Sequence, residues 1–265
     1  MSAVRNRPRP PCEARRRPPT DHGRGPSPSR PAVSSRCREA YPEPVRDERE
    51  DEDFGQAWAA APEAVRRSLG LAYEALEAGG LAVGSVLVDA AGTVLAEGRN
   101  HAYDTGPGNG PLRGTPLAHA ELNALGSART EWDLGTTTLW STQEPCLMCS
   151  AAASFTGVGA VRYLAPDPWA LATGNEGSSW GTCVTGGVWL VAANVMFLKS
   201  VSEVAEGGEE PATLSRNRML EPETAHLHDG LPPGPPTSPS VRAWLSEAWP
   251  GIIEAATARR LRTGG

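Results

Sequence analysis

Two short motifs constrain this chain more than any other feature of its sequence: His119-Ala120-Glu121 and Pro145-Cys146-Leu147-Met148-Cys149. Together they offer one imidazole, two thiols and a spare carboxylate. Zn²⁺ binds nitrogen and sulfur donors tetrahedrally, and a site with three protein ligands keeps its fourth position for water, whereas a structural site uses four ligands. The motifs therefore predict a catalytic zinc site, in which a carboxylate as near as Glu121 is suited to carry protons.

The spacing within each motif also predicts where the site lies in the secondary structure. His119 and Glu121 are two positions apart, about 200° around an ideal helix, so they can converge only over the end of a helix. Cys146 and Cys149 are three positions apart and share one helix face, behind a proline that favours a first turn. We therefore expect two helix N-termini to meet at the metal, where their positive ends favour thiolates.

The order and spacing of these residues resemble the signature of the zinc-dependent nucleobase and nucleoside deaminases, H-x-E followed by P-C-x-x-C. The wider segments 118–125 and 142–149 are most similar to the branch of the cytidine/deoxycytidylate deaminase superfamily that holds guanine, cytosine and tRNA-adenosine deaminases. The resemblance covers roughly residues 60–200. It implies hydrolytic deamination, in which water replaces the exocyclic amine of a base, and it also implies a homodimer.

Carried over residue by residue, the resemblance implies that His119, Cys146 and Cys149 bind zinc and that Glu121 is the general acid/base. It also implies that Asn100, at the end of a predicted strand, binds the substrate. An asparagine ahead of a Gly-rich loop is also an ordinary turn former, so that alternative stays open. A lone C-x-x-C pair could belong to a redox site or to half of a structural zinc site, and its combination with H-x-E is what favours catalysis.

Hydrophobic periodicity predicts a three-layer α/β/α domain with a mixed central sheet, which is also the cytidine deaminase-like fold that the resemblance implies. The expected order is helix, hairpin, helix, strand, helix, strand and a last helical element. The expected ranges are residues 62–78 for the first helix, 81–88 and 93–96 for the hairpin, 115 onward for the second helix, 136–142 for a buried strand, 145–156 for the helix of the cysteines, 158–165 for the next strand and 185–200 for the last element.

The sequence predicts four parts along the chain. Residues 1–53 hold twelve arginines, ten acids and many prolines but few large apolar side chains, which predicts a disordered tail. The zinc-dependent deaminase domain is expected at residues 54–201. Residues 202–240 are acidic and rich in Pro and Gly, which predicts a linker, and residues 241–265 are expected to form a C-terminal helical segment that Pro250 breaks or kinks.

The charge balance bears on the substrate. Residues 54–265 carry thirteen Lys and Arg residues against twenty-one Asp and Glu residues, a balance of −8. Because tRNA is a polyanion and calls for a basic surface, this balance favours a free nucleobase or nucleoside of the guanine, adenosine or cytidine type. Two alternatives remain: a tRNA-specific adenosine deaminase, whose arginine-rich tail would supply charge, and a catalytically inactive zinc-stabilised binding module. An intact Glu121 counts against the module, because zinc ligation does not need that carboxylate.

Cysteine usage and the apolar runs bear on location. Five cysteines are an odd number, two of which are assigned to the metal, so no disulfide framework is predicted and a reducing cytoplasm fits. No apolar run reaches transmembrane length, so no membrane partner is expected. Residues 15–17 are three arginines, but prolines and polar residues follow them where export requires an apolar segment. The loop 167–181 contains two tryptophans, which either close over a base or only anchor the loop.

Overall fold

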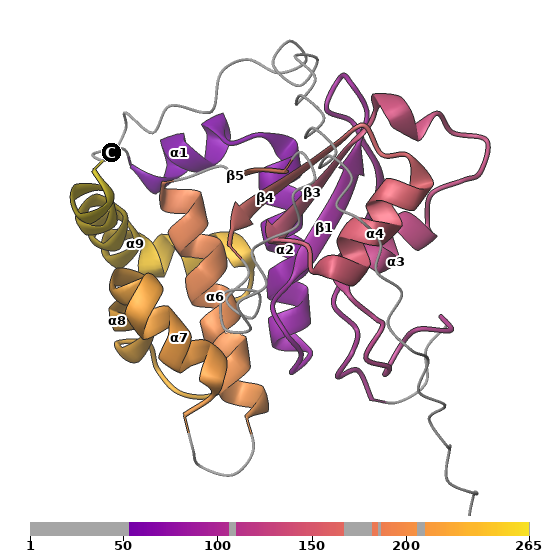
Figure 1. Cartoon of the computed structure of the whole chain (residues 1–265). Coiled ribbons are helices and arrows are strands. Elements are labelled where there is room, and N and C mark those ends of the chain that lie inside the picture. Colours follow the sequence, from indigo (N-terminus) through magenta and orange to yellow (C-terminus); the bar gives the residue numbers. More distant parts are fainter. Residues whose placement is uncertain (1–52, 106–109, 167–181, 185–186, 206–209, 265) are drawn as a thin grey trace, which may run out of the picture. The chain divides into compact units, whose positions relative to one another are not determined.

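The computed structural model describes residues 53–105, 110–166, 182–184, 187–205 and 210–264 (Figure 1). The predicted tail up to residue 52 and the predicted loop 167–181 lie outside the described residues. All of the described residues belong to one compact unit.

Five strands form one sheet in the order β2-β1-β3-β4-β5. β1 pairs antiparallel with both β2 and β3, whereas β3, β4 and β5 run parallel to one another. The predicted mixed sheet is therefore confirmed, with β5 as an additional edge strand. The strands are β1 (Gly84–Val88), β2 (Val94–Arg99), β3 (Thr138–Gln143), β4 (Ala160–Ala165) and β5 (Thr182–Val184).

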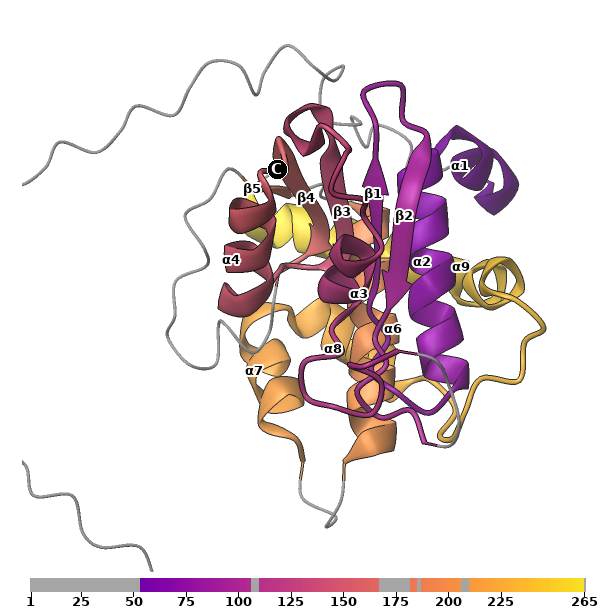
Figure 2. The ribbon, with the colours of Figure 1, turned by 90° about the vertical axis from the view of Figure 1, so that its right-hand side faces the viewer.

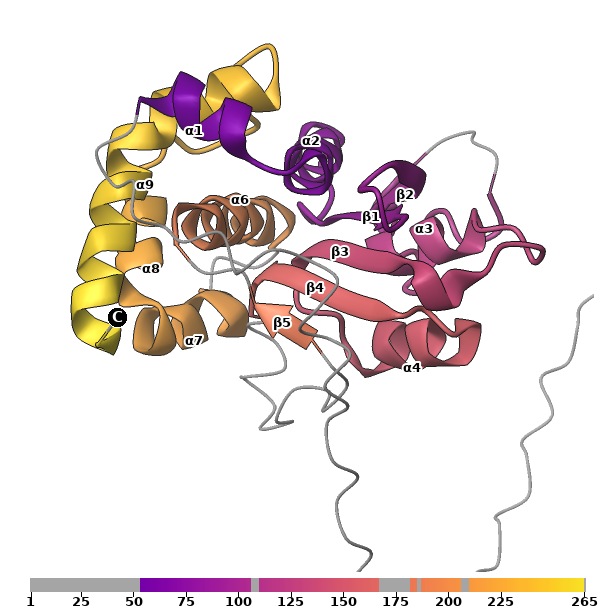
Figure 3. The ribbon, with the colours of Figure 1, turned by 90° about the horizontal axis from the view of Figure 1, so that it is seen from above.

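Helices cover both faces of the sheet, which confirms the three-layer α/β/α fold (Figure 3). Helices α3 and α4 lie on one face, in front of the sheet in Figure 2, while α2 and α6 lie on the other face. Helices α7, α8 and α9 pack against α6, and α1 packs against α9. The helices are α1 (Phe54–Ala60), α2 (Glu63–Glu77), α3 (Ala120–Gly126), α4 (Leu147–Thr156), α6 (Val188–Val204), α7 (Ala212–Leu220), α8 (Pro222–Asp229) and α9 (Val241–Thr263), with the short 3₁₀ helix η2 at Leu134–Thr136.

Two glycines allow helices to approach the sheet closely. A Cβ atom at Gly84 of β1 would lie 2.1 Å from the backbone oxygen of Ser68 in α2. One at Gly98 of β2 would lie 2.5 Å from the backbone nitrogen of Ala124 in α3. Both distances are shorter than any real side chain tolerates, so only glycine permits this packing. The contact at Gly98 holds α3, which begins at the metal motif, directly against β2.

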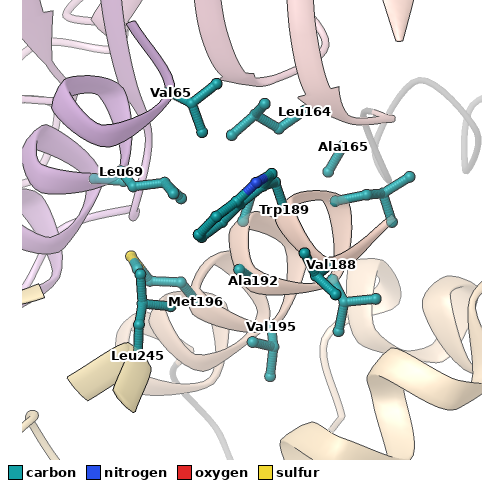
Figure 4. Close-up of a cluster of buried hydrophobic side chains, with 14 of the residues drawn as sticks. Val65, Leu69, Leu164, Ala165, Val188, Trp189, Ala192, Val195, Met196 and Leu245 are labelled. Atoms are coloured by element: carbon teal, nitrogen blue, oxygen red, sulfur yellow. The ribbon is translucent and has the colours of Figure 1, made fainter. Parts of the chain in front are cut away.

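The main hydrophobic core lies between the sheet and the helices α2, α6 and α9. Figure 4 shows Trp189 of α6 among Leu69 of α2, Leu164 of β4 and Leu245 of α9. Nearly every residue of α6 from Val188 to Val201 is buried, because this helix packs on the sheet with one side and on α7, α8 and α9 with the others. A helix that is apolar all round is expected in such a central position.

Three expectations about elements were wrong in part. Residues 202–240 are not a plain linker, because they contain α7 and α8, whose small buried residues such as Thr224 and Ala225 pack inward despite the acidic composition. Helix α9 continues through Pro250 without a break. The second helix begins at residue 120 rather than 115, because the residues ahead of His119 form turns. Within the described ranges, no helix is long and apolar enough to cross a membrane.

Candidate metal centre and adjoining cavity

The three candidate metal ligands lie at the starts of two helices, where the sequence places them. His119 is the N-cap residue of α3 and Cys146 is the N-cap residue of α4, while Cys149 lies in the first turn of α4. The first N–H groups of a helix have no partner within the helix, and they carry the positive end of its dipole. Both helix starts therefore stabilise negative charge at the point where the ligands meet.

The ligand atoms are close enough to share one metal ion. His119 Nδ1 lies 3.7 Å from Cys146 Sγ and 3.6 Å from Cys149 Sγ, and the three ligand atoms all lie within 4.8 Å of one another. Tetrahedral zinc, with bonds of about 2.3 Å to sulfur and about 2.0 Å to nitrogen, sets ligand atoms roughly 3.5 to 3.8 Å apart. One nitrogen and two sulfurs at these separations fit zinc. The structure therefore confirms a site that is able to hold the predicted cofactor.

The two thiols differ in their surroundings. Hydrogen bonds from Cys149 and His119 lower the pKa of Cys146 to about 4, so this sulfur is a thiolate at neutral pH. The pKa of Cys149 is raised, first because it donates its proton to Cys146 and second because it is buried. A metal ion deprotonates a coordinating thiol outright, so both sulfurs can serve as thiolate ligands once the ion is present.

Glu121 lies beside the ligands and is 3% exposed. Its Oε1 accepts a hydrogen bond from Ser141 Oγ at 3.2 Å, and its Oε2 lies 3.5 Å from Cys149 Sγ. Burial raises the pKa of the Glu121 carboxyl. A backbone hydrogen bond and the charge of His119 act in the opposite direction, but they offset this increase only in part. A carboxyl with a raised pKa holds and releases a proton more readily near neutral pH than an exposed one.

A cavity of about 490 Å³ opens directly onto this group. Its polar lining includes His119, Glu121, Asn100, Gln143, Glu144 and Cys146. Its apolar lining includes Leu81, Val83, Phe197 and Val201, which belong to one hydrophobic cluster. A planar base needs an apolar slot with a few placed polar groups, and this cavity has that composition.

Asn100 lines the cavity and is 3% exposed, so the structure brings it together with the metal ligands and Glu121. Its side-chain Oδ1 accepts a hydrogen bond from the backbone N–H of Ala102 at 2.9 Å. Its backbone N–H donates to the backbone oxygen of Val83, also at 2.9 Å. The contact with Ala102 fixes the orientation of the side-chain amide, because only the oxygen can accept a backbone N–H. The amide nitrogen of Asn100 is therefore the group that can donate to a ligand.

Two parts of the site were missed by the sequence reasoning. Ser141 is a fully buried hydroxyl that bonds to Glu121, and its place within the buried strand β3 was a usable signal. The acidic residue Asp104 binds Arg99 and Arg113 next to Asn100. No local pattern in the sequence indicates that pairing, because Arg113 lies beyond the Gly- and Pro-rich run that follows Asp104.

Comparison with known proteins identifies the segment that carries the site. Residues 60–165 match the family described as the cytidine and deoxycytidylate deaminase zinc-binding region. A tRNA(Ile)-lysidine synthase of Deinococcus deserti is 38% identical over 136 residues, which cover 47% of this chain and 24% of that protein. A tRNA-specific adenosine deaminase of Haemophilus influenzae is 36% identical over 91 residues, which cover 33% of this chain and 48% of that protein. The matched region thus spans less than half the length of these relatives.

Two solved structures similar to this chain are guanine deaminases. The guanine deaminase of Bacillus subtilis is 31% identical, with a TM-score of 0.34 over 42% of this chain and 68% of its own. The guanine deaminase of Nitrosomonas europaea is 24% identical, with a TM-score of 0.43 over 54% of this chain and 86% of its own. Residues 60–165, which hold the three metal-ligand candidates and Glu121, therefore form a cytidine and deoxycytidylate deaminase zinc-binding region.

Proposed function

We propose that the protein is a zinc-dependent hydrolytic deaminase that removes the exocyclic amine of a free nucleobase or nucleoside. The observation that carries the proposal is the position of Glu121: a buried carboxyl that lies beside a three-ligand metal site and lines a cavity large enough to hold a base or a nucleoside. Neither metal ligation nor packing requires a carboxylate at this place. Its presence favours an enzyme over an inactive zinc-stabilised binding module.

In the proposed mechanism, Glu121 moves the protons. Zinc, when bound by His119, Cys146 and Cys149, makes water nucleophilic at neutral pH. Glu121 accepts a proton from the attacking water and delivers it to the ring nitrogen of the substrate. A second proton goes from the added hydroxyl through the same carboxylate to the leaving amine, which departs as ammonia while the ring gains a carbonyl. Ser141 holds the Oε1 atom of Glu121 and so keeps its orientation through these transfers.

Asn100 is proposed to orient the substrate. Because its Oδ1 is occupied by Ala102, its amide nitrogen donates to an acceptor on the base or on the sugar. Phe197 and Val83 supply the apolar surface against which the ring lies. Neutral polar contact on one side and apolar contact on the other are the usual means of holding a small planar ligand.

Charge favours a small, neutral substrate. Among the described residues that line the cavity there is no Lys or Arg to bind a phosphate, and two are glutamates. Nine of the thirteen basic residues in the segment 54–265 form ion pairs with carboxylates and so present little uncompensated positive charge. The paired residues are Arg66, Arg67, Arg99, Arg113, Arg129, Lys199, Arg218, Arg259 and Arg262.

A second candidate function is a tRNA-specific adenosine deaminase. The specific observation in its favour is that the curated relatives carry the names of tRNA-modifying enzymes, a lysidine synthase and an adenosine deaminase. For this function the arginines of residues 1–53 would have to supply the phosphate contacts that the paired arginines of the domain do not.

Ammonia release separates the two functions. Purified zinc-loaded protein is incubated with guanine, cytosine, adenosine, cytidine, deoxycytidylate and tRNA, at 50 and at 200 mM salt. The proposal expects ammonia from a free base or nucleoside, with rates that change less than about threefold between the two salt concentrations, because few counterions are released. Release from tRNA alone, with KM rising about tenfold or more at the higher salt or on deletion of residues 1–53, would replace the first function with the second.

The assembly and location expected from the sequence stay predictions. A homodimer would cover the exposed apolar side chains of α4, where Leu147 is 61% and Phe155 is 92% exposed. Sedimentation of the wild-type protein tests the dimer. The cytoplasmic location stays a prediction from cysteine usage.

A further inference from the structure

A buried ion-pair cluster lies next to Asn100. The side chain of Asp104 is 1% exposed, and both of its oxygens accept from Arg99, at 2.9 and 2.8 Å. Arg113 reaches the same carboxylate at 3.0 Å from the far end of the Gly- and Pro-rich run. Burial alone would raise the pKa of Asp104, but the hydrogen bond from Arg99 and the two positive charges outweigh it and lower that pKa.

The cluster is tied to the turn that holds Asn100. The Nη1 atom of Arg99 donates to Asp104 and also to the backbone oxygen of Asn100, each at 2.9 Å. Within the same turn, Asn100 Oδ1 accepts from Ala102 at 2.9 Å. The guanidinium group of Arg99 therefore links the side chain of Asp104 to the backbone of Asn100 within the turn 99–104.

The same turn is attached to the segment that leads into the metal site. Asn123 of α3 donates through its Nδ2 to the oxygens of Arg99 at 2.8 Å and Ala118 at 3.3 Å. The backbone N–H of His101 also donates to the oxygen of Ala118, at 2.9 Å. Ala118 directly precedes the metal ligand His119, so the orientation of the Asn100 turn and that of the ligand are linked by short contacts.

We infer that Arg99, Asp104 and Arg113 form a brace that positions Asn100 relative to His119 and Glu121. Asp104 is thus a positioning residue for substrate binding, and this inference rests on the proposed function for the role of Asn100. Arg113 gives Asp104 a second positively charged partner, from the segment that precedes His119. A buried carboxylate with two arginine partners holds one geometry because leaving any of these charges unpaired is unfavourable.

A different use of these arginines, as an anion site, is disfavoured by their partners. A neighbouring cavity of about 420 Å³ is lined by Arg67, Arg99 and Arg113. Arg67 pairs with Glu74 and Glu97, and the other two pair with Asp104. These carboxylates match the three positive charges, so the cavity offers no net charge to a phosphate.

The brace is tested with Asp104→Asn, which keeps the side-chain size and removes the charge. Amide hydrogen exchange is expected to speed up at residues 99–104 and to stay unchanged in α4, because only the turn loses its fixed partner. With a substrate found by ammonia release, KM is expected to rise about tenfold while kcat changes less than about threefold, and the zinc content stays at the wild-type value. The matched control is Glu131→Gln, which removes an exposed carboxylate from Arg129 and should change neither quantity.

Arg113→Lys provides a second variant if Asp104→Asn does not fold. It keeps the positive charge but loses the planar fork, so the same changes are expected at smaller size. Unchanged exchange and unchanged KM in the variant that folds would overturn the brace, and so would a parallel loss of zinc, because that would mean a general structural role. If wild-type protein releases ammonia from no substrate, the proposed function fails, and the exchange experiment still decides whether the brace exists.

Discussion

The deaminase segment, residues 60–165, and the helices α6 to α9 that follow it contribute to the molecule in opposite ways. The first segment carries buried polar groups with named partners, such as Glu121 with Ser141 and Asn100 with Ala102. The later helices contribute mainly apolar contacts, among them most of α6 and the tryptophans of α9. The chemistry therefore depends on a few residues of the first segment, whereas Phe197 and Val201, which complete the apolar lining of the cavity, come from a later helix.

The two regions are joined through specific contacts. Tyr73 of α2 donates to the oxygen of Ser238, ahead of α9, at 2.6 Å. Ser200 of α6 accepts through its Oγ from the backbone N–H of Ala82 at 2.9 Å. Phe197 of α6 forms part of the cavity wall. Changes at Glu121 and the metal-ligand candidates should consequently alter activity first, and changes in the second region should alter stability first.

The largest effect is expected from removal of a metal ligand. Cys149→Ala and His119→Ala should each lose bound zinc and all measurable deamination, because two remaining ligands cannot hold the ion. Metal analysis of the purified proteins measures this loss directly. About one zinc per chain is expected for the wild type. Leu261→Ala serves as the control, since this side chain of α9 is 77% exposed and is far from the ligands in sequence. Full zinc occupancy in either ligand variant would refute the assignment.

In the second region, Trp249→Ala should destabilise the fold by about 3 to 5 kcal/mol. The indole of Trp249 is 5% exposed and packs against Phe54 at 5.2 Å and Trp189 at 5.4 Å between ring centroids, so its loss leaves a cavity between three helices. Chemical denaturation measures the change. Leu261→Ala, on the same helix but 77% exposed, should change stability by less than about 0.5 kcal/mol. Equal effects of the two substitutions would mean that α9 is not part of the core.

Glu121→Gln should lower kcat by about 10²-fold or more, equal to roughly 2.7 kcal/mol, while zinc and fold are retained. Glutamine keeps the shape and can still accept from Ser141, but it cannot take up a proton. Steady-state kinetics with the active substrate, beside metal analysis, separates the two consequences. Wild-type turnover in this variant would dismiss Glu121 as the proton carrier, and Glu131→Gln provides the exposed carboxylate for comparison.

The contrast between the regions also explains what the sequence predicts. The convergence of the three metal-ligand candidates and Glu121 at two helix starts follows from short motifs with fixed spacing. The sequence predicts a linker where α7 and α8 form, because acids, Gly and Pro dominate residues 202–240. The few inward-facing residues, such as Leu214 and Ala225, do not form a long periodic pattern. The brace on Asp104 depends on a contact across the run 105–112, and contacts of that kind arise only after the chain has folded.

The smallest effect is expected in the stability that the Asp104 ion pairs contribute, as the pH is lowered. The pKa of Asp104 is lower in the folded protein than in the unfolded chain, where it is about 3.9. The ion pairs of Asp104 therefore contribute their full stability above the unfolded pKa. This stability is lost as the pH falls through the pKa of the folded protein. The stability difference between wild type and Asp104→Asn should be about 1.5 to 3 kcal/mol at pH 7, as for hydrogen bonds to charged groups, and should shrink below about pH 4. Thermal unfolding of both proteins from pH 7 to 3 measures it, and protonation of the metal ligands affects both alike. A difference that stays constant down to pH 3 would mean that the Asp104 charge is not what stabilises the turn.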